Sequence, residues 1–419
     1  CAQVRYICGM VKRFMLWLII VTGAAIALYV AWYNRMVDDD LIMVTAVKRA
    51  GVLGATIEQY HSWNTRWMSF LHLHTWMWFL NAGSTLLFYH LATFTALVLA
   101  FWRLVRIPLV NECLRPEMRP QSGLTAGLLS IALLMCTFDI ADTWYWMNTS
   151  TMYGWNLIAL LFAIGLILQP LRRSFFQDSL LTFLGLYYGG ASEPAVGIYF
   201  LAITGLYYLR KDLLQVHQRH LINFSIGVTV GFLIAWFGAG HAKRDAALPD
   251  LDALGLLTKG VYFTAKIALY HLPIRLLLAL PILFSIWQPG KLYKGNSLLK
   301  TTIRTKIIGL LLLSAHTFFM VWIMGDYGPA RAWSHISLLM IILTSLWILN
   351  SQIQLRPFLL NTTLGIVLAA LLYTGYQQIE QVPAYRNYLN NLQSGKIEFD
   401  PKNIPESGLI HKVTMGRVE

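Results

Sequence analysis

Two adjoining stretches decide the fold: FMLWLIIVTGAAIALYVAWY (residues 14–33) and, shortly after it, the acidic triplet Asp38-Asp39-Asp40. The first stretch has the length and composition of a helix that crosses a lipid bilayer. Carboxylates close to a bilayer are costly, and by default they indicate a functional site. The alternative interpretation is a solvated anionic helix end. Three adjacent like charges repel one another, which favours the functional interpretation.

The composition of the whole chain predicts a membrane protein. The sequence is 57% hydrophobic and only 13% charged, whereas about a quarter of the residues of a soluble domain are charged. The apolar runs are continuous and do not alternate, which favours membrane helices over a membrane β-barrel. The net charge of +13 comes mainly from short loops between the runs, so we expect it to set topology and not to bind nucleic acid.

The apolar runs predict an all-α polytopic membrane protein with about 11 transmembrane helices. The expected spans are residues 14–33, 82–102, 122–138, 155–171, 175–190, 195–209, 221–238, 261–288, 307–324, 334–350 and 357–377. We expect a transmembrane domain over residues 1–378 and a periplasmic C-terminal tail over 379–419. No cleavable signal peptide is evident, so we expect the first span to act as a signal anchor. The four cysteines lack the spacing of a disulfide framework or a zinc site.

Basic residues predict the orientation. Arg5, Lys12 and Arg13 precede the first span, which places the N-terminus in the cytoplasm. The C-terminus and the acidic triplet then lie in the periplasm. Residues 34–80 form a long first periplasmic loop, whose mixed apolar and aromatic pattern predicts helices lying in the interface.

The triplet and this loop form the first candidate site. Asp39 and Asp40 are the preferred general base or metal ligands, and Asp38 is a weaker candidate because it is closer to the span. Further along the loop, Tyr60-x-x-Trp63-x-x-Arg66 predicts that Trp63 and Arg66 share a helix face. Three interpretations of Arg66 are open: a structural partner of the outer carboxylates, a bidentate phosphate ligand, or an ordinary interfacial arginine.

Later residues supply further candidates for substrate binding. At the outer ends of spans these are Asp142 and Trp144; Glu193; His241, Lys243 and Arg244; and Arg331. Lys266 and Arg275 lie inside the eighth apolar stretch and join the basic cluster as candidates for lipid-phosphate binding. Aromatic rings stack on sugars, and intramembrane cations usually face a polar cavity. Each cluster also has a structural interpretation: an interfacial aromatic belt, a helix-initiating acid before proline, or an interfacial helix.

The order of these motifs resembles the GT-C class of integral membrane glycosyltransferases. The resemblance covers most of residues 14–335. It rests on the acids after the first span, on Tyr60-x-x-Trp63-x-x-Arg66, on Asp142-Thr143-Trp144-Tyr145-Trp146, on Gly190-Ala191-Ser192-Glu193 and on Gly238-x-Gly240-His241-x-x-Arg244. An uncharacterised bacterial polytopic family placed near these enzymes is similar in the same motifs.

This resemblance implies a glycosyltransferase of a bacterial inner membrane. Such an enzyme moves a sugar from a polyprenyl-phosphate donor to a glycan, lipid or protein acceptor on the periplasmic face. An acid of the first outer loop acts as base or holds a divalent metal, Mg²⁺ or Mn²⁺. Two alternatives remain open. One is a polysaccharide polymerase or ligase that uses lipid-diphosphate donors, and the other is a non-enzymatic lipid or glycan transporter or a subunit of an envelope complex.

Overall fold

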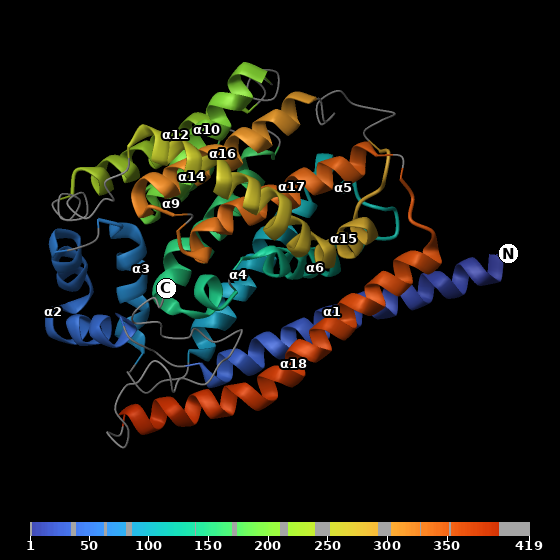
Figure 1. Cartoon of the computed structure of the whole chain (residues 1–419), viewed down its shortest axis with the longest axis horizontal. Coiled ribbons are helices and arrows are strands. Elements are labelled where there is room, and N and C mark those ends of the chain that lie inside the picture. Colours follow the sequence, from blue (N-terminus) through green and yellow to red (C-terminus); the bar gives the residue numbers. More distant parts are fainter. Residues whose placement is uncertain are drawn as a thin grey trace.

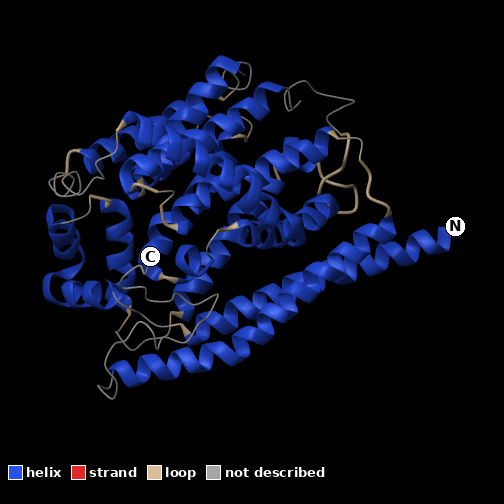
Figure 2. Ribbon diagram, in the orientation of Figure 1, coloured by secondary structure: helices blue, strands red, loops and turns tan. Residues whose placement is uncertain are grey.

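The described part of the chain is all-helical in the computed structural model (Figure 2). It comprises residues 2–34, 39–62, 65–80, 86–138, 140–169, 174–209, 217–238, 252–291, 303–326, 328–351 and 353–393. The side chains of Asp39 and Asp142 also lie outside the described part. An isolated antiparallel bridge between Leu114 and Trp287 joins two loops, and the described residues contain no strand.

The elements follow one another along the chain in this order. The first half contains α1 (Ala2–Tyr33), α2 (Asp39–Ser62), α3 (Trp67–Phe79), α4 (Leu87–Val105), α5 (Pro108–Asn111), α6 (Ser122–Cys136), η1 (Ala141–Tyr145), α7 (Met147–Thr149), η2 (Ser150–Gly154), α8 (Trp155–Ile167) and α9 (Phe175–Ala191). The second half contains α10 (Glu193–Leu209), α12 (Gln218–Trp236), α14 (Ala253–Lys266), η3 (Ile267–His271), α15 (Leu272–Ile286), α16 (Ile303–Met324), η5 (Ala330–Trp333), α17 (Ser334–Asn350) and α18 (Pro357–Gln393).

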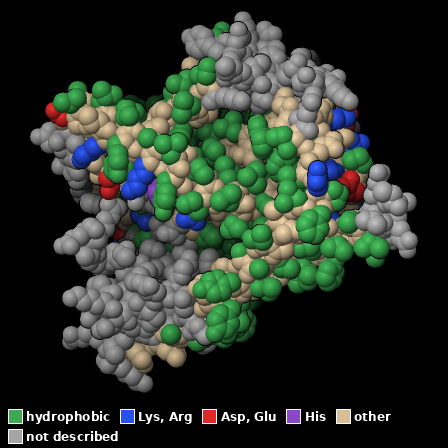
Figure 3. All heavy atoms as spheres, turned by 45° about the vertical axis from the view of Figure 1, so that its right-hand side comes forward, with side chains coloured by type: hydrophobic (Ala, Val, Ile, Leu, Met, Phe, Trp, Pro, Cys, Tyr) green, Lys and Arg blue, Asp and Glu red, His purple; other side chains and the backbone are tan. Residues whose placement is uncertain are grey.

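Eight helical segments of the described chain are long and apolar enough to cross a membrane. Many large apolar side chains on them are exposed, such as Trp17, Phe88 and Leu277. On the face shown in Figure 3, charged side chains gather on two opposite sides, and hydrophobic ones lie between them. The prediction of an α-helical polytopic membrane protein is therefore confirmed.

The first and last helices pack side by side and run in the same direction (Figure 1). Near their starts, the Asn361 amide donates to the Cys8 carbonyl at 3.4 Å. Further along, Gly365 lies against Met15 and Gly375 lies against Ile26. This parallel pair forms one edge of the molecule.

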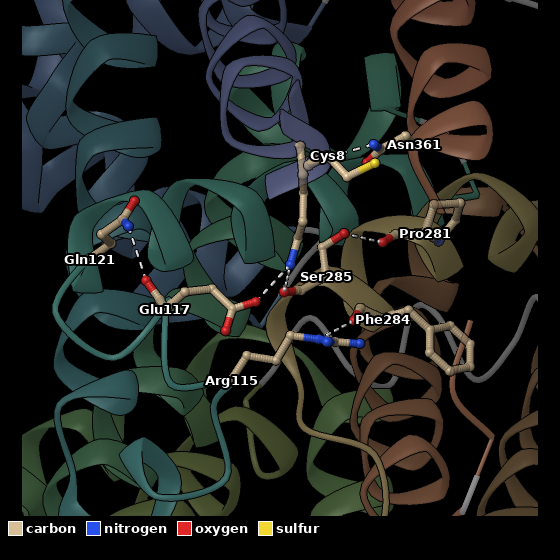
Figure 4. Close-up of polar contacts among 9 residues, drawn as sticks. Cys8, Arg115, Glu117, Gln121, Pro281, Phe284, Ser285 and Asn361 are labelled. Atoms are coloured by element: carbon tan, nitrogen blue, oxygen red, sulfur yellow. Dashed lines mark hydrogen bonds and ion pairs between the residues drawn. The ribbon is translucent and has the colours of Figure 1, made fainter. Parts of the chain in front are cut away.

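A polar cluster attaches the start of α1 to the rest of the bundle (Figure 4). The Lys12 ammonium lies 3.1 Å from Glu117 Oε1 and donates to the Ser285 carbonyl at 3.4 Å. Arg115 donates through Nε to the Phe284 carbonyl at 2.9 Å. Burial raises the pKa of Glu117, but its backbone hydrogen bond and Lys12 together hold it below the ordinary value. The cluster therefore joins α1, the loop before α6 and α15.

α9 and α12 approach each other closely through two pairs of glycines. A methyl group built on Gly185 or Gly189 would lie 2.2 or 2.1 Å from a backbone carbonyl oxygen of α12. Methyl groups on Gly227 and Gly231 would meet the α9 backbone at 2.1 and 2.4 Å. Gly185-x-x-x-Gly189 faces Gly227-x-x-x-Gly231, which is the small-residue spacing that lets membrane helices approach closely.

Several predicted helix boundaries differ from the structure. The helical segment predicted to begin at 261 begins at Ala253, and α18 continues to Gln393, beyond the expected end at 377. Trp63 lies outside the described residues, but Arg66 is not helical, with φ −74° and ψ 59° before α3. α2 ends at Ser62, so the prediction that Trp63 and Arg66 share a helix face is wrong. Periodicity did not reveal this break, because neither flanking helix carries a strong amphipathic pattern.

Candidate functional site

Residues 141–154, named here the central segment, lie among the helices and carry buried polar side chains. The segment consists of η1, α7 and η2, in which two π-helical turns flank one short α-helical turn. Its buried polar residues are Thr143, Asn148, Thr149, Ser150 and Thr151. Irregular backbone at membrane depth is tolerated where protein or a cavity surrounds it, and π-helical turns are frequent at functional sites.

The central segment lies beside the C-terminal end of α1. Asn34 follows that helix, and its amide donates to the Tyr145 carbonyl at 2.6 Å. Lys12 is near the opposite end of α1, roughly 33 Å away at 1.5 Å per helical residue. The central segment and the Lys12–Glu117 cluster therefore lie about one bilayer thickness apart.

Asp40, the acid of the triplet whose side chain is described, lies at the central segment. It lies in the first turn of α2, where the helix dipole favours a negative charge. Its side chain is fully buried. The backbone N–H of Asn148 donates to Asp40 Oδ1 at 3.1 Å. A buried carboxylate with a backbone donor is held in one orientation, as a general base requires.

Arg66 and Glu193 form a buried ion pair on another side of the central segment. Arg66 Nε donates to Glu193 Oε2 at 2.7 Å, and only 13% and 7% of their side chains are exposed. Arg66 Nη1 also lies 3.4 Å from Met152 Sδ and 3.5 Å from the Tyr153 hydroxyl. Burial lowers the pKa of Arg66, but Glu193 and Tyr153 together raise it above the ordinary value. The pair joins the start of α3 to the start of α10.

Arg331 approaches the same segment from η5. Its guanidinium carbon lies 5.4 Å from the centre of the Trp146 ring, within the range of a cation–π contact. The structure therefore brings Asp40, Arg66 and Arg331, three residues far apart in the sequence, to one segment of 14 residues (141–154).

A chain of hydrogen bonds leads from α3 to the central segment through His72. Trp76 Nε1 donates to His72 Nε2 at 2.9 Å, so the proton of the neutral ring is on Nδ1. His72 Nδ1 then donates to the Tyr187 hydroxyl at 2.8 Å, and Tyr187 donates to the Thr151 carbonyl at 3.0 Å. This chain requires a neutral His72.

Acidification is expected to destabilise the protein through His72. Burial lowers its pKa from 6.5 to about 4. Between these two values the unfolded chain binds a proton at His72 that the folded chain does not. The free energy of unfolding should therefore fall by about 1.4 kcal/mol per pH unit as the pH drops from 6.5 towards 4. Melting temperatures from pH 7.5 to 4.5 would show a shallower decline for His72→Gln. Equal slopes for the two proteins would contradict this role.

Of the remaining predicted site residues, four have described side chains and the others do not. Trp144 is fully buried and donates to the Thr137 hydroxyl, and Tyr60 donates to the Ile234 carbonyl at 2.6 Å. Arg275 donates to the Thr137 and Phe138 carbonyls at the end of α6, and Lys266 is the last residue of α14. The other predicted site residues lie outside the described residues or have side chains outside them: Asp38, Asp39, Trp63, Asp142, His241, Lys243 and Arg244.

The described residues do not provide a metal centre by themselves. No group of three or more histidine, cysteine or acidic side chains comes together in the described ranges. Of the three acids of the triplet, Asp40 is the one whose side chain the structure describes. Its Oδ1 already accepts a hydrogen bond from the Asn148 N–H. The side chain of Asp39, the other preferred ligand, lies outside the described residues, so binding of Mg²⁺ or Mn²⁺ stays a prediction.

Sequence reasoning missed several residues of the site. Asn148-Thr149-Ser150-Thr151 is a run of four polar residues between the spans expected at 122–138 and 155–171, where the apolar pattern predicts a loop. The polar run itself was the available signal. His72 was missed because a single histidine in an aromatic-rich stretch has no sequence pattern that marks it as functional.

These features define the class: a multi-pass α-helical membrane protein with a buried polar centre near one end of its helices. Comparison with known proteins adds no relative, because no family model, no curated protein and no solved structure matches the chain.

Proposed function

We propose that the chain is an integral membrane glycosyltransferase that moves a sugar from a polyprenyl-phosphate donor to an acceptor hydroxyl or amide. One observation carries this proposal: a buried, oriented carboxylate, Asp40, lies on the same folded segment that two arginines approach. A base is needed to accept the acceptor's proton, and cations are needed beside the phosphate leaving group.

The proposed reaction uses Asp40 as the base. Its carboxylate takes the acceptor proton while the acceptor atom forms a bond to the anomeric carbon. The bond between that carbon and the phosphate oxygen breaks, and the polyprenyl phosphate leaves with the electron pair. Arg331 is the proposed partner of the phosphate, because its guanidinium lies over the Trp146 ring of the central segment. Asp40 is fully buried, so acceptor binding must open the contact between α2 and α7.

For topology, we propose eleven crossings, with a cytoplasmic N-terminus and a periplasmic C-terminus in a bacterial inner membrane. The parallel packing of α1 and α18 supports an odd number of crossings, since the first and last helices then cross the bilayer in the same direction. α6, α9 and α10 have 15, 17 and 17 residues and supply the three crossings beyond the eight long segments. Contacts of Asn156 with Tyr188 and of Gln177 with Leu166 make α9 antiparallel to α8, as such alternation requires.

Replacement of Asp40 tests the enzymatic proposal. Asp40→Asn should lower sugar transfer in isolated membranes by about 10²–10⁴-fold, the range expected for loss of a general base. The assay measures release of polyprenyl phosphate from labelled donors. Glu58→Gln is the matched control, since Glu58 is an exposed carboxylate of α2 beyond the kink at Gly51. Full activity of Asp40→Asn, or no transfer by the wild type with any polyprenyl-phosphate sugar, would reject the proposal.

A lipid or glycan transporter is the second candidate, and the helix breaks favour it. The π-helical turns of the central segment break the regular α-helix before α8. The π-helical turn η3 likewise breaks the 34-residue helical segment Ala253–Ile286. Transporters use such interrupted helices at their binding sites. Wild-type protein in vesicles that moved labelled polyprenyl-phosphate sugar across the bilayer without breaking the sugar–phosphate bond would favour this alternative.

A further inference from the structure

A second polar site lies at the end of the bundle where α4 ends and α6 begins. A cavity of about 470 Å³ opens there, lined by Arg106, Pro108, Asn111, Glu112, Arg119 and Ser122. The polar cluster of Lys12 and Glu117 is at the same end, because Gln121, next to Ser122, donates to the Glu117 carbonyl. This end is therefore remote from the central segment.

Two guanidinium groups are positioned at this cavity by contacts other than ion pairs. Arg106 lies over the Trp102 ring, with 4.5 Å from its guanidinium carbon to the ring centre. Arg119 donates through Nε to the Leu114 carbonyl at 3.3 Å and through Nη2 to the Glu112 carbonyl at 3.1 Å. Within the described residues, neither guanidinium lies within 4.0 Å of a carboxylate oxygen. Both cations therefore remain available to an anionic ligand.

The start of α6 adds donors to the same cavity. Ser122 is the first residue of this 15-residue helix, and the preceding Gln121 makes no side-chain cap. The first N–H groups of a helix have no partner within the helix and favour a phosphate. Arginine binds phosphate oxygens in bidentate fashion, so this donor set suits a phosphodiester.

Two further features select a lipid headgroup as the phosphate. The exposed side chains of Leu91, Leu99 and Trp102 follow one face of α4 towards the cavity, as their helical spacing requires. Trp102 is the residue type enriched at the membrane–water interface. Acyl chains can therefore lie along α4 while the phosphate reaches the arginines. Glu112 lines the cavity too, and an acidic residue there suits a headgroup that carries a primary ammonium.

We propose that this cavity binds the phosphoethanolamine headgroup of a membrane phospholipid. The phosphodiester lies on Arg106, Arg119 and the start of α6, and the ammonium lies on Glu112. The bound lipid anchors the loop between α4 and α6.

Lipid retention tests this site independently of sugar transfer. The full chain is purified from micelles containing equal amounts of phosphatidylethanolamine and phosphatidylglycerol, and retained lipid per protein is measured by mass spectrometry after extraction.

Wild type should retain phosphatidylethanolamine preferentially. Arg106→Gln should lower retention about five-fold, since each basic residue near a membrane surface contributes about that factor. Glu112→Gln should abolish the preference over phosphatidylglycerol. Arg13→Gln, an exposed arginine on α1 outside the cavity, should behave as wild type.

Size-exclusion profiles check that each variant is folded. Arg106→Gln should not disturb the fold, because the Arg106 side chain is exposed. Unchanged retention in Arg106→Gln would overturn the site. Equal retention of both lipids by wild type would overturn the ammonium contact with Glu112. Displacement of the lipid by millimolar inorganic phosphate would show that the cavity binds a soluble phosphate, and would overturn the lipid assignment.

Discussion

Gly189→Ala is expected to lower the melting temperature of the protein sharply, because it would force α9 away from α12. The added methyl carbon would lie 2.1 Å from the Val228 carbonyl oxygen and 3.0 Å from the Phe232 nitrogen. These are backbone atoms on a packed helix, so a side-chain rotation cannot relieve the clash. Overpacking of this kind costs about 1–3 kcal/mol, and we expect the upper end because the obstacle is backbone.

Melting curves in detergent, followed by size-exclusion chromatography, would measure this effect. Gly197→Ala is the matched control on the neighbouring helix α10, where a methyl group would have no neighbour within 4 Å. The control should be neutral or slightly stabilising, because alanine favours a helix over glycine by up to about 1 kcal/mol. Gly185→Ala should resemble Gly189→Ala, since its methyl carbon would lie 2.2 Å from the Phe224 carbonyl oxygen. Similar melting temperatures for Gly189→Ala and Gly197→Ala would contradict the close contact.

The long apolar helices were predictable from sequence, while their partners were not. Residues 14–33 and 307–324 are apolar over a whole bilayer thickness, and both are helical segments of spanning length in the structure. Gly185-x-x-x-Gly189 and Gly227-x-x-x-Gly231 are visible in the sequence, but spacing within one helix does not say which other helix it faces.

The candidate site was only partly predictable, for a similar reason. The acidic triplet marked the right region, but one sequence cannot decide which of three adjacent side chains turns inward. Asp40 reaches Asn148, a residue 108 positions later, through the fold of α2 against α7. Arg66 was predicted as a phosphate ligand, whereas its ion pair with Glu193 gives it a structural partner 127 positions away. Contacts of this range depend on tertiary packing and leave no local pattern.

The buried Arg66–Glu193 pair yields the other large expected effect. Arg66→Met should lower the free energy of unfolding by about 3–5 kcal/mol, because it leaves the Glu193 carboxylate buried without its cation. Glu193→Gln alone should be similarly harmful, since the Arg66 guanidinium would then lose its charged partner. The double variant Arg66→Met/Glu193→Gln removes both charges, and we expect it to be more stable than either single variant.

A double-mutant cycle of thermal or denaturant unfolding would measure this coupling. The exposed pair Arg49–Glu58 on α2 is the matched control, with 70% and 50% of its side chains exposed. Exposed pairs contribute about 0–1 kcal/mol, so Arg49→Met should have little effect. If the Arg66–Glu193 coupling were no larger than that of Arg49–Glu58, the pair would not hold the starts of α3 and α10 together. The cycle also separates structure from chemistry: if the double variant folds but transfers no sugar, one of these two side chains acts on the substrate as well as on the fold.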